Sequence, residues 1–309
     1  MRVRMLARLV LSMVVIASGF GAAVIAADSP VAEKIVNKPK VAGQFVLKLR
    51  TREETAKGSG EWKEGSRLVQ WNASETAIII CDMWDDHYCK SAAERVAEMV
   101  PRMNAVLTAA RNHGATVIHA PSGVVYLYAD MPQRKRMQQA AKFKPELALE
   151  PWCNVDPKRE PELPVDVSRQ ACDDPIVGAY VQKFTRQHPG LTISGWDGVS
   201  DNGEEILNYL KQEGIKNVVL MGVHTNMCVL GRPFGIRQMV KQGFNVTLTR
   251  DLTDAMYDPR EKPHVSHTRG TELVVEHIEK YWCPSILGED LTRVSPGSAD
   301  PQKPVTPTP

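Results

Sequence analysis

The chain has 309 residues, 43% of them apolar, which is enough to bury the core of one large domain. Its formal net charge is +2, and no basic stripe with interleaved aromatic residues occurs along it. Composition therefore argues against a nucleic-acid partner and leaves the function to be sought in local motifs.

The N-terminus has the layout of a secretory signal peptide. Arginines at the start precede an apolar run over residues 9–25, and small residues stand just before Asp28. This pattern predicts cleavage after Ala26 or Ala27, a signal peptide over 1–27, export to the periplasm or the cell exterior, and no stable membrane span afterwards. A membrane anchor is the alternative, because the apolar run is slightly longer than that of an average signal peptide.

Residues 28–75 form an N-terminal extension. Its segments 44–50 and 67–71 alternate between apolar and polar residues on either side of the glycine-containing stretch K-G-S-G-E. Such alternation around a turn predicts a β-hairpin added to the main domain.

From residue 76 to 292 the pattern alternates between strands and helices. The predicted strands cover 77–81, 116–119, 179–183, 217–221 and 245–249. The predicted helices cover 92–113, 134–143, 203–213, 228–241 and 271–281. This order predicts an α/β fold, a doubly wound, mostly parallel sheet with helices on both faces.

Two regions fall outside the alternation. The stretch 121–175 is irregular except for its one predicted helix, and loops of that length usually cover a functional site. The tail 293–309 is rich in proline and polar residues, so it is predicted to be disordered.

The segment N-V-V-L-M-G-V-H-T-N-M-C-V, residues 217–229, is the main candidate for a site. A buried strand, a break at Gly222 and a helix starting at Cys228 place the sulfur at the carboxyl edge of the sheet, where ligands bind. A helix N-terminus there favours a thiolate. The alternative is a buried structural cysteine.

Other polar residues follow predicted strands. Asp82 comes directly after four apolar residues, which predicts a partly desolvated acid suited to proton transfer, or else a helix N-cap. His119 ends the second strand and is either a site residue or a core histidine. Lys183 follows an apolar stretch and taken alone is a surface lysine.

The six cysteines contain no CxxC pair, which argues against a zinc ribbon or a thioredoxin motif. In an exported protein disulfides are expected. Cys81 lies in a strand and is predicted to be buried and free. Cys153 and Cys172 flank a proline-rich loop and are the predicted bridge, although spacing does not determine connectivity.

The chain resembles the isochorismatase-like cysteine hydrolases, which include nicotinamidases and N-carbamoylsarcosine amidase. The resemblance is carried by Asp82, by Lys183 before Phe184, and by the motif G-V-H-T-N-M-C-V with D-L-T-D-A-M after it. The resemblance covers residues 76–278. It implies that Cys228 is the nucleophile, Asp82 the base and Lys183 the cation that supports the charged form.

The resemblance also implies a cis peptide bond between Val223 and His224. It further implies an oxyanion hole made by the backbone N–H groups of His224 and Cys228. Family members commonly assemble into oligomers, so a homo-oligomer is expected.

The sequence departs from the nicotinamidase pattern after the second strand, where Pro121 stands in place of a metal-binding Asp. No cofactor and no nicotinamidase-type metal are therefore expected, although His87 and His119 remain conceivable ligands for an ion. Residues just past the strand ends are predicted to form the substrate pocket: Trp84, His87, His119, Ser122 and Tyr126.

These patterns predict an exported hydrolase that cleaves a carbon–nitrogen bond, amide or ureido, of a small molecule through a cysteine acyl-enzyme. One alternative is a vinyl ether hydrolase of the isochorismatase type that uses Asp82 without the thiol. A second is a non-catalytic binding protein with the 121–175 region as its contact surface.

Overall fold

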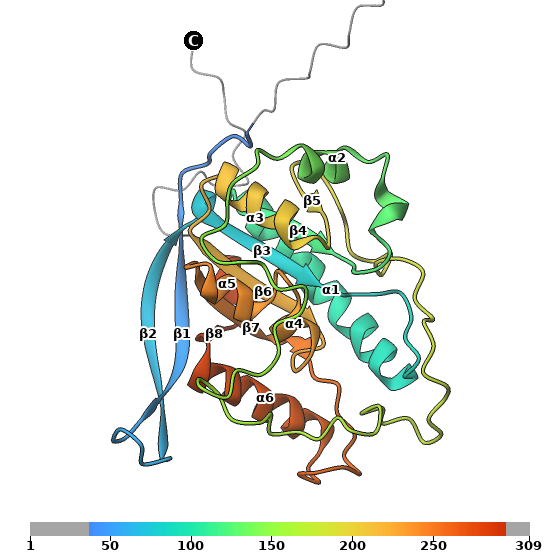
Figure 1. Cartoon of the computed structure of the whole chain (residues 1–309). Helices are drawn as coiled ribbons and strands as arrows, with labels where there is room; N and C mark the ends of the chain where they lie inside the picture. The colour runs from blue at the N-terminus through green and yellow to red at the C-terminus, as the bar shows by residue number, and fades with distance from the viewer. Residues whose placement is uncertain (1–36, 295–309) are drawn as a thin grey trace, which may run out of the picture. The chain divides into compact units, whose positions relative to one another are not determined.

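The computed structural model describes residues 37–294, and eight strands in this part of the chain form one sheet in the order β2-β1-β8-β7-β6-β3-β4-β5 (Figure 1). The predicted signal peptide and nearly all of the predicted tail lie outside the described residues. The strands are β1 Gln44–Glu54, β2 Trp62–Asn72, β3 Thr76–Cys81, β4 Thr116–Ala120, β5 Gly198–Val199, β6 Asn217–Val223, β7 Asn245–Asp254 and β8 Ser285–Ile286.

Six neighbouring strands, β8-β7-β6-β3-β4-β5, run parallel to one another. Strand β3 lies between β4 and β6 near the centre of this group. Every residue of β3, β4 and β6 is buried, as expected for strands covered on both faces. The prediction of a doubly wound, mostly parallel sheet is confirmed.

Helices cover both faces of the sheet. They are α1 Lys90–Asn112, α2 Pro132–Gln139, α3 Gly203–Gln212, α4 Cys228–Gly231, α5 Ile236–Lys241 and α6 His267–Tyr281, with 3-10 turns η1 Ala73–Glu75, η2 Val125–Tyr128 and η3 Gly288–Leu291. The apolar side of α1 packs on Ile78 and Ile80. The helices α3, α5 and α6 pack on the opposite side, where Ile79 and Leu220 point. Successive side chains along each strand point to opposite faces of the sheet, so an apolar layer forms on each face.

The N-terminal hairpin extends this sheet. β1 pairs antiparallel with β2 along its whole length, and Arg50 of β1 pairs with Ser285 of β8. Phe45, Leu47 and Leu49 alternate along β1 and are buried in the same layer as α1. The hairpin therefore continues the core of the parallel sheet.

Two predicted elements differ in the structure. Residues 179–183 form no strand, and Tyr180 and Val181 are exposed, because β5 occupies the position beside β4. The helix predicted over 228–241 is divided into α4 and α5. Pro233 lies at the break, where a proline has no N–H to donate and holds the preceding residue, Arg232, in an extended conformation.

The connection from β4 to β5, residues 121–197, is here called the cover. It contains η2 and α2, the latter replacing the helix predicted over 134–143, and is otherwise irregular. Glu160 holds its middle to the domain, since the buried carboxylate accepts hydrogen bonds from Arg237 of α5 and His277 of α6, both at 2.7 Å. The cover is thus fixed by long-range polar contacts.

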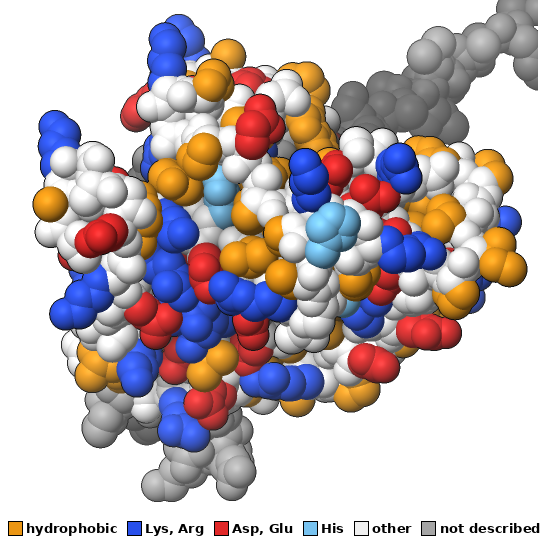
Figure 2. All heavy atoms as spheres, turned by 90° about the horizontal axis from the view of Figure 1, so that it is seen from below, with side chains coloured by type: hydrophobic (Ala, Val, Ile, Leu, Met, Phe, Trp, Pro, Cys, Tyr) orange, Lys and Arg blue, Asp and Glu red, His pale blue; other side chains and the backbone are white. Residues whose placement is uncertain are grey.

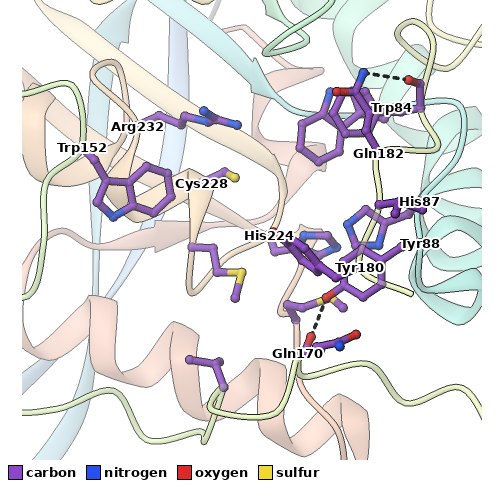
Figure 3. Close-up of a pocket in the computed structure, with 15 residues that line it drawn as sticks. Trp84, His87, Tyr88, Trp152, Gln170, Tyr180, Gln182, His224, Cys228 and Arg232 are labelled. Carbon is purple, nitrogen blue, oxygen red and sulfur yellow. Dashed lines mark hydrogen bonds between the residues drawn. The ribbon is translucent and has the colours of Figure 1, made fainter. Parts of the chain in front are cut away.

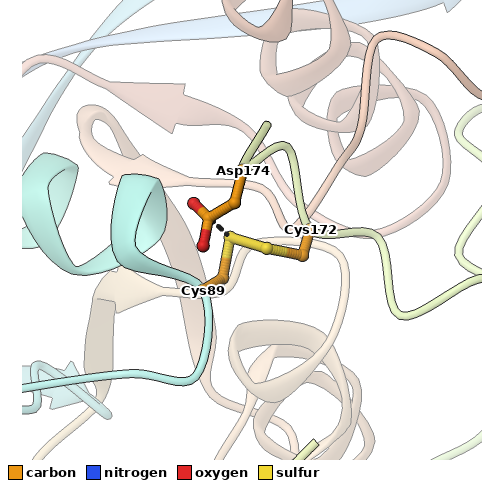
Figure 4. Close-up of side chains that lie close together, drawn as sticks. All are labelled: Cys89, Cys172 and Asp174. Carbon is orange, nitrogen blue, oxygen red and sulfur yellow. Dashed lines mark hydrogen bonds between the residues drawn. A yellow bond between two sulfur atoms is a disulfide. The ribbon is translucent and has the colours of Figure 1, made fainter. Parts of the chain in front are cut away.

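The disulfide joins Cys89 to Cys172, so the predicted Cys153–Cys172 pairing is wrong (Figure 4). The cover folds back to the start of α1, where the Asp174 carboxylate accepts hydrogen bonds from the N–H groups of Lys90 and Ser91. That return path brings Cys172 to Cys89 across 83 residues, a contact that spacing does not reveal. Four cysteines are free and buried: Cys81, Cys153, Cys228 and Cys283.

Charged side chains of both signs are interleaved on the face seen from below in Figure 2. This mixture agrees with the near-neutral net charge. Within residues 37–294, no helix combines the length and hydrophobicity that crossing a membrane requires.

Candidate active site

The end of β6 approaches the end of β3 closely at Gly222. Gly222 has φ of 102°, and a Cβ atom there would lie 2.1 Å from the carbonyl oxygen of Cys81. Only glycine fits this backbone. The Val223–His224 peptide bond that follows is cis, as the resemblance implies. The chain then enters α4, and Cys228 lies at the carboxyl edge of the sheet.

Asp82 follows β3 directly and is fully buried, with φ of 47°, in the left-handed region that non-glycine residues rarely adopt. One carboxylate oxygen accepts the backbone N–H of Ser122 at 2.8 Å. The other accepts the Nε and Nη2 groups of Arg232 at 3.0 and 2.9 Å. Asp82 is therefore no N-cap; Asp174 serves the start of α1 instead.

Cys228 lies beside this carboxylate and is 9% exposed. Burial raises the pKa of the Cys228 thiol well above its ordinary value, and the negative charge of Asp82 and a hydrogen bond to that carboxylate raise it further. Arg232 and the His224 backbone oppose the rise without cancelling it. The expectation of a thiolate favoured by a helix N-terminus is wrong, because α4 has only four residues and burial prevails. The resting sulfur keeps its proton, and Asp82 is placed to take it.

The cation beside Asp82 is Arg232, whereas Lys183 is exposed and forms no ion pair within the part of the chain that the structure describes. Burial disfavours the charged guanidinium, but the Asp82 charge outweighs it and the pKa of Arg232 rises. The sequence pattern favoured Lys183 over Arg232, because Lys183 stands where the hydrolases that the chain resembles carry their lysine. The available signal was spacing, since Arg232 stands four residues after Cys228, one turn further along the same predicted helix.

Two backbone N–H groups close to Cys228 in the chain lack an oxygen acceptor. Within residues 37–294, the N–H groups of His224 and Cys228 donate to no backbone or side-chain oxygen, while neighbouring N–H groups, such as that of Thr225, do. The His224 backbone hydrogen-bonds to the Cys228 sulfur, which places one donor beside that sulfur. Among residues 37–294 the Cys228 N–H thus has no acceptor and the His224 N–H has only the sulfur, and backbone donors placed in this way can receive an oxyanion.

A cavity of about 610 Å³ opens at the Cys228 sulfur (Figure 3). Trp152 and Arg232 lie on one side of Cys228, and His224, His87 and Trp84 lie on the other. The further lining residues come from the cover, the loop before α1, the turn after β6 and the loop after β7: Tyr88, Val167, Gln170, Tyr180, Val181, Gln182, Phe184, Met227 and Met256. The cover therefore builds much of the cavity wall.

Of the residues predicted for the pocket, Trp84 and His87 line this cavity, whereas His119, Ser122 and Tyr126 do not. His119 is fully buried, with its ring nitrogens 2.9 Å from Gln187 and 3.3 Å from Asp197, which makes it a core histidine. Because both nitrogens are engaged, it cannot join His87 as a metal ligand.

Ser122 and Tyr126 are placed differently. Ser122 orients Asp82 through its backbone N–H and accepts the Trp84 indole N–H at its carbonyl, 3.2 Å away. The Tyr126 side chain is 68% exposed, because η2 turns it outward. Position just past a strand end did not predict the direction of these side chains.

His87 and His224 are neutral at neutral pH. Burial lowers the pKa of His87 to about 4 and that of His224 to about 3. Their rings lie 5.1 Å apart, edge to face.

The isochorismatase domain family model matches residues 76–273 of the chain. Similar solved structures include a cysteine hydrolase from Pseudomonas syringae pv. phaseolicola 1448A, at 16% identity over 73% of this chain and 95% of that one, with a TM-score of 0.44. An isochorismatase-like hydrolase from Alkaliphilus metalliredigens has 15% identity over 72% and 98%, with a TM-score of 0.41. N-carbamoylsarcosine amidase from Thermoplasma acidophilum has 14% identity over 70% and 97%, with a TM-score of 0.36. No curated protein sequence matches the chain.

Proposed function

The chain belongs to the isochorismatase domain family, and on that premise we propose that it is an exported cysteine hydrolase that cleaves a carbon–nitrogen bond of a small molecule. Cys228 is the nucleophile, Asp82 the general base and acid, and Arg232 the cation that orients Asp82. The single observation that carries the proposal is the position of Asp82, which contacts both the Cys228 thiol and the Arg232 guanidinium.

The first half of the reaction forms a thioester. The Cys228 sulfur attacks the carbonyl carbon as its proton passes to Asp82, and the oxyanion is held by the N–H groups of His224 and Cys228. The carbon–nitrogen bond then breaks, and the leaving amine takes the proton from Asp82. A thiol that stays protonated until attack requires this transfer, since only the thiolate is strongly nucleophilic.

The second half releases the acid. Water enters the cavity, gives a proton to Asp82 and attacks the thioester carbonyl. The carbon–sulfur bond breaks, and the sulfur recovers its proton from Asp82. Arg232 keeps the carboxylate in one orientation through both halves, because its two hydrogen bonds hold one oxygen while the Ser122 N–H holds the other.

The test is ammonia release from a panel of small amides and ureides by Cys228→Ala, with Cys153→Ala as the matched control. Cys153 is also buried and free but does not line the cavity. Turnover by Cys228→Ala should fall at least about a thousandfold, and that of the control should stay near wild type. Undiminished turnover by Cys228→Ala would exclude a cysteine mechanism.

Iodoacetamide separates the alternatives. A vinyl ether hydrolase that uses Asp82 alone would keep its activity after alkylation of Cys228. A non-catalytic binding protein would show no turnover on any substrate, with or without the thiol.

Export rests on the arginine-led apolar run at the N-terminus. The Cys89–Cys172 disulfide supports it, since disulfides persist in oxidising compartments. Fractionation of cells that express the full chain tests this point: the processed protein should begin at Ala27 or Asp28 and be found outside the cytoplasm.

A further inference from the structure

A second cavity, here called the hairpin hollow, lies where β1 of the hairpin meets β7 and α6. Strand β8, which stands between β1 and β7 in the sheet, has only two residues. The hollow has a volume of about 560 Å³. Its lining comes from β1, α1, β7, α6 and the residue before η3: Arg50, Arg52, Arg95, Arg250, Asp251, Thr253, Asp254, His267, Thr268, Thr271, Glu272, Val275, Glu276 and Leu287. None of these residues lines the cavity at Cys228, so the two cavities are separate.

The carboxylates of the hairpin hollow are already matched by cations. Each of the four that line it forms an ion pair with an arginine: Asp251 with Arg102, Asp254 with Arg95, and Glu272 and Glu276 with Arg269. The fully buried Glu279 carboxylate lies behind the lining and accepts hydrogen bonds from Arg50 and Arg52, at 2.7 and 3.1 Å. Three of the four lining arginines therefore have acidic partners within the protein.

Arg250 is the fourth lining arginine, and it forms no ion pair with any residue of 37–294. Its side chain is partly buried and makes one hydrogen bond within this range, from Nη1 to the Ser285 hydroxyl at 3.3 Å. Burial and the nearby charge of Arg50 lower the pKa of Arg250, and carboxylates further away do not reverse the shift. A partly buried guanidinium with unused N–H groups and no counter-ion is completed by an anion from solution.

The start of α6 is a second feature of the hollow that favours an anion. This helix has 15 residues, and His267, Thr268 and Thr271 of its first turns line the hollow. The Ser266 hydroxyl caps the N–H group of Arg269, whereas those of His267 and Thr268 donate to no oxygen among residues 37–294. Free N–H groups and the partial positive charge of a helix N-terminus both stabilise a bound oxyanion.

The hairpin supplies one wall of the hollow. Arg50 and Arg52 belong to β1, which lies outside the residues 76–273 that match the isochorismatase domain family model. On the face seen from below in Figure 2, Lys and Arg side chains gather toward the side of the hairpin, with acidic side chains among them. The hollow is therefore built partly by the N-terminal extension and not by the family domain alone.

We propose that the hairpin hollow binds the phosphate group of a small phosphorylated molecule, and that Arg250 is the residue that pairs with it. A guanidinium holds its N–H groups in a planar fork that matches two phosphate oxygens. Arg50 adds a second positive charge close to Arg250, and the start of α6 adds a third favourable group. The volume of the hollow is typical of small-molecule pockets, so it has room for an organic part beside the phosphate.

Calorimetry on the purified protein measures the binding of three probes: inorganic phosphate, glycerol 3-phosphate and succinate. Potassium chloride keeps the ionic strength constant, so that screening is the same in every titration. Both phosphates should bind saturably at one site per chain, and succinate should bind at least about tenfold more weakly than either, because its planar carboxylates match the site less well. No saturable binding of either phosphate, or equal binding of succinate, overturns the proposal.

Substitutions locate the site. Arg250→Gln removes the charge but keeps a donor for Ser285, and it should weaken phosphate binding at least about tenfold, as expected for loss of a charge-assisted hydrogen bond. Arg250→Lys keeps the charge without the fork and should bind with intermediate affinity. The matched control is Arg186→Gln, because Arg186 is an exposed arginine of the cover that does not line the hollow. Equal affinities of wild type and Arg250→Gln contradict the assignment. Circular dichroism checks folding, and the three-probe series on wild type decides the proposal even if a variant fails to fold.

Vesicles distinguish a soluble phosphate ester from a lipid headgroup. The protein is sedimented with vesicles of phosphatidylcholine that contain phosphatidic acid. Wild type should remain in the supernatant, because the proposed ligand is a small soluble molecule. Cosedimentation of wild type that Arg250→Gln abolishes would assign the phosphate group to a lipid and overturn the small-molecule ligand.

The phosphate site and the proposed hydrolase fail separately. Phosphate binding is measured without turnover, and Cys228→Ala should bind phosphate as wild type does, because Cys228 does not line the hollow. If Arg232→Met lost phosphate binding while Arg250→Gln kept it, the phosphate would lie in the cavity at Cys228, and the proposed site in the hairpin hollow would be wrong.

Discussion

The sheet edge and the cover contribute to the site in different ways. At the sheet edge, Asp82 and Cys228 follow buried parallel strands, and their places are set by backbone geometry at Gly222. In the cover, Trp152 and Gln170 reach the cavity on irregular backbone that is held by side-chain contacts such as that of Glu160.

Under the proposed function, the difference assigns reaction and selection to separate parts of the molecule. Atoms that react need positions within a fraction of an ångström, which a packed sheet supplies. Walls that choose a substrate can change without disturbing that sheet, and loops tolerate such change. Trp152 is an example of a wall residue from the cover that meets the sheet edge. Its ring packs against Gly231, and the Arg232 guanidinium lies 5.7 Å from the ring centroid.

The largest effect is expected from Asp82→Asn, at the sheet edge. An amide cannot accept the Cys228 proton, so kcat/KM should fall about a thousandfold, in the upper range for loss of a general base. Steady-state kinetics with the best amide of the panel measure this, and Asp130→Asn, an exposed aspartate of the cover, is the control. A loss below tenfold would show that another group moves the proton.

Removal of the disulfide tests the attachment of the cover. Cys89→Ser with Cys172→Ser should lower the free energy of unfolding by about 4 kcal/mol, since the bridge closes a long loop of the unfolded chain. Urea denaturation measures the change.

Thiol titration of the denatured, unreduced protein checks the pairing. Wild type should show the four free cysteines, and Cys153→Ala one fewer. If Cys153 were the partner of Cys172, the same substitution would release a thiol and the titre would rise.

Glu160→Gln should destabilise the protein by about 3 kcal/mol, because it leaves Arg237 without its buried partner. Glu162→Gln, exposed on the same segment, should have little effect. Urea denaturation compares the two variants, and equal stabilities would mean that the cover is held elsewhere.

The ionisation of Glu160 predicts that the stability of the protein depends on pH. Burial opposes ionisation of Glu160, but hydrogen bonds from His277 and Arg237 prevail and lower its pKa from 4.5 to about 2. A lowered pKa gives stability that is present above pH 4.5 and is lost as the pH falls toward 2. Wild type should therefore lose stability more steeply across this interval than Glu160→Gln does; parallel curves would contradict the contact.

The smallest effect is expected from Lys183→Ala. Its side chain is exposed and Arg232 already neutralises Asp82, so kcat/KM should change by less than about threefold. Arg232→Met should lower it by at least about tenfold, since the Asp82 carboxylate then loses its buried partner. The reverse ranking would restore Lys183 as the working cation.

Sequence reasoning found the residues whose positions follow from the nearest strand. Asp82 and Cys228 could be predicted because an apolar run ends just before Asp82 and a glycine turn precedes Cys228. It missed Arg232, since Pro233 breaks the predicted helix and aims the guanidinium at a residue 150 positions earlier. It also misplaced His119, Tyr126 and the partner of Cys172.

By itself, the sequence determined the alternation of strands and helices, the parallel sheet and the places of Asp82 and Cys228 at its carboxyl edge. Apolar periodicity and a required glycine are local properties, so they can be read along the chain. The tertiary structure alone decided the cation, the disulfide and the cavity at Cys228. Each of these depends on the cover or on a side-chain direction, and contacts between residues far apart in the chain leave no periodic trace in it.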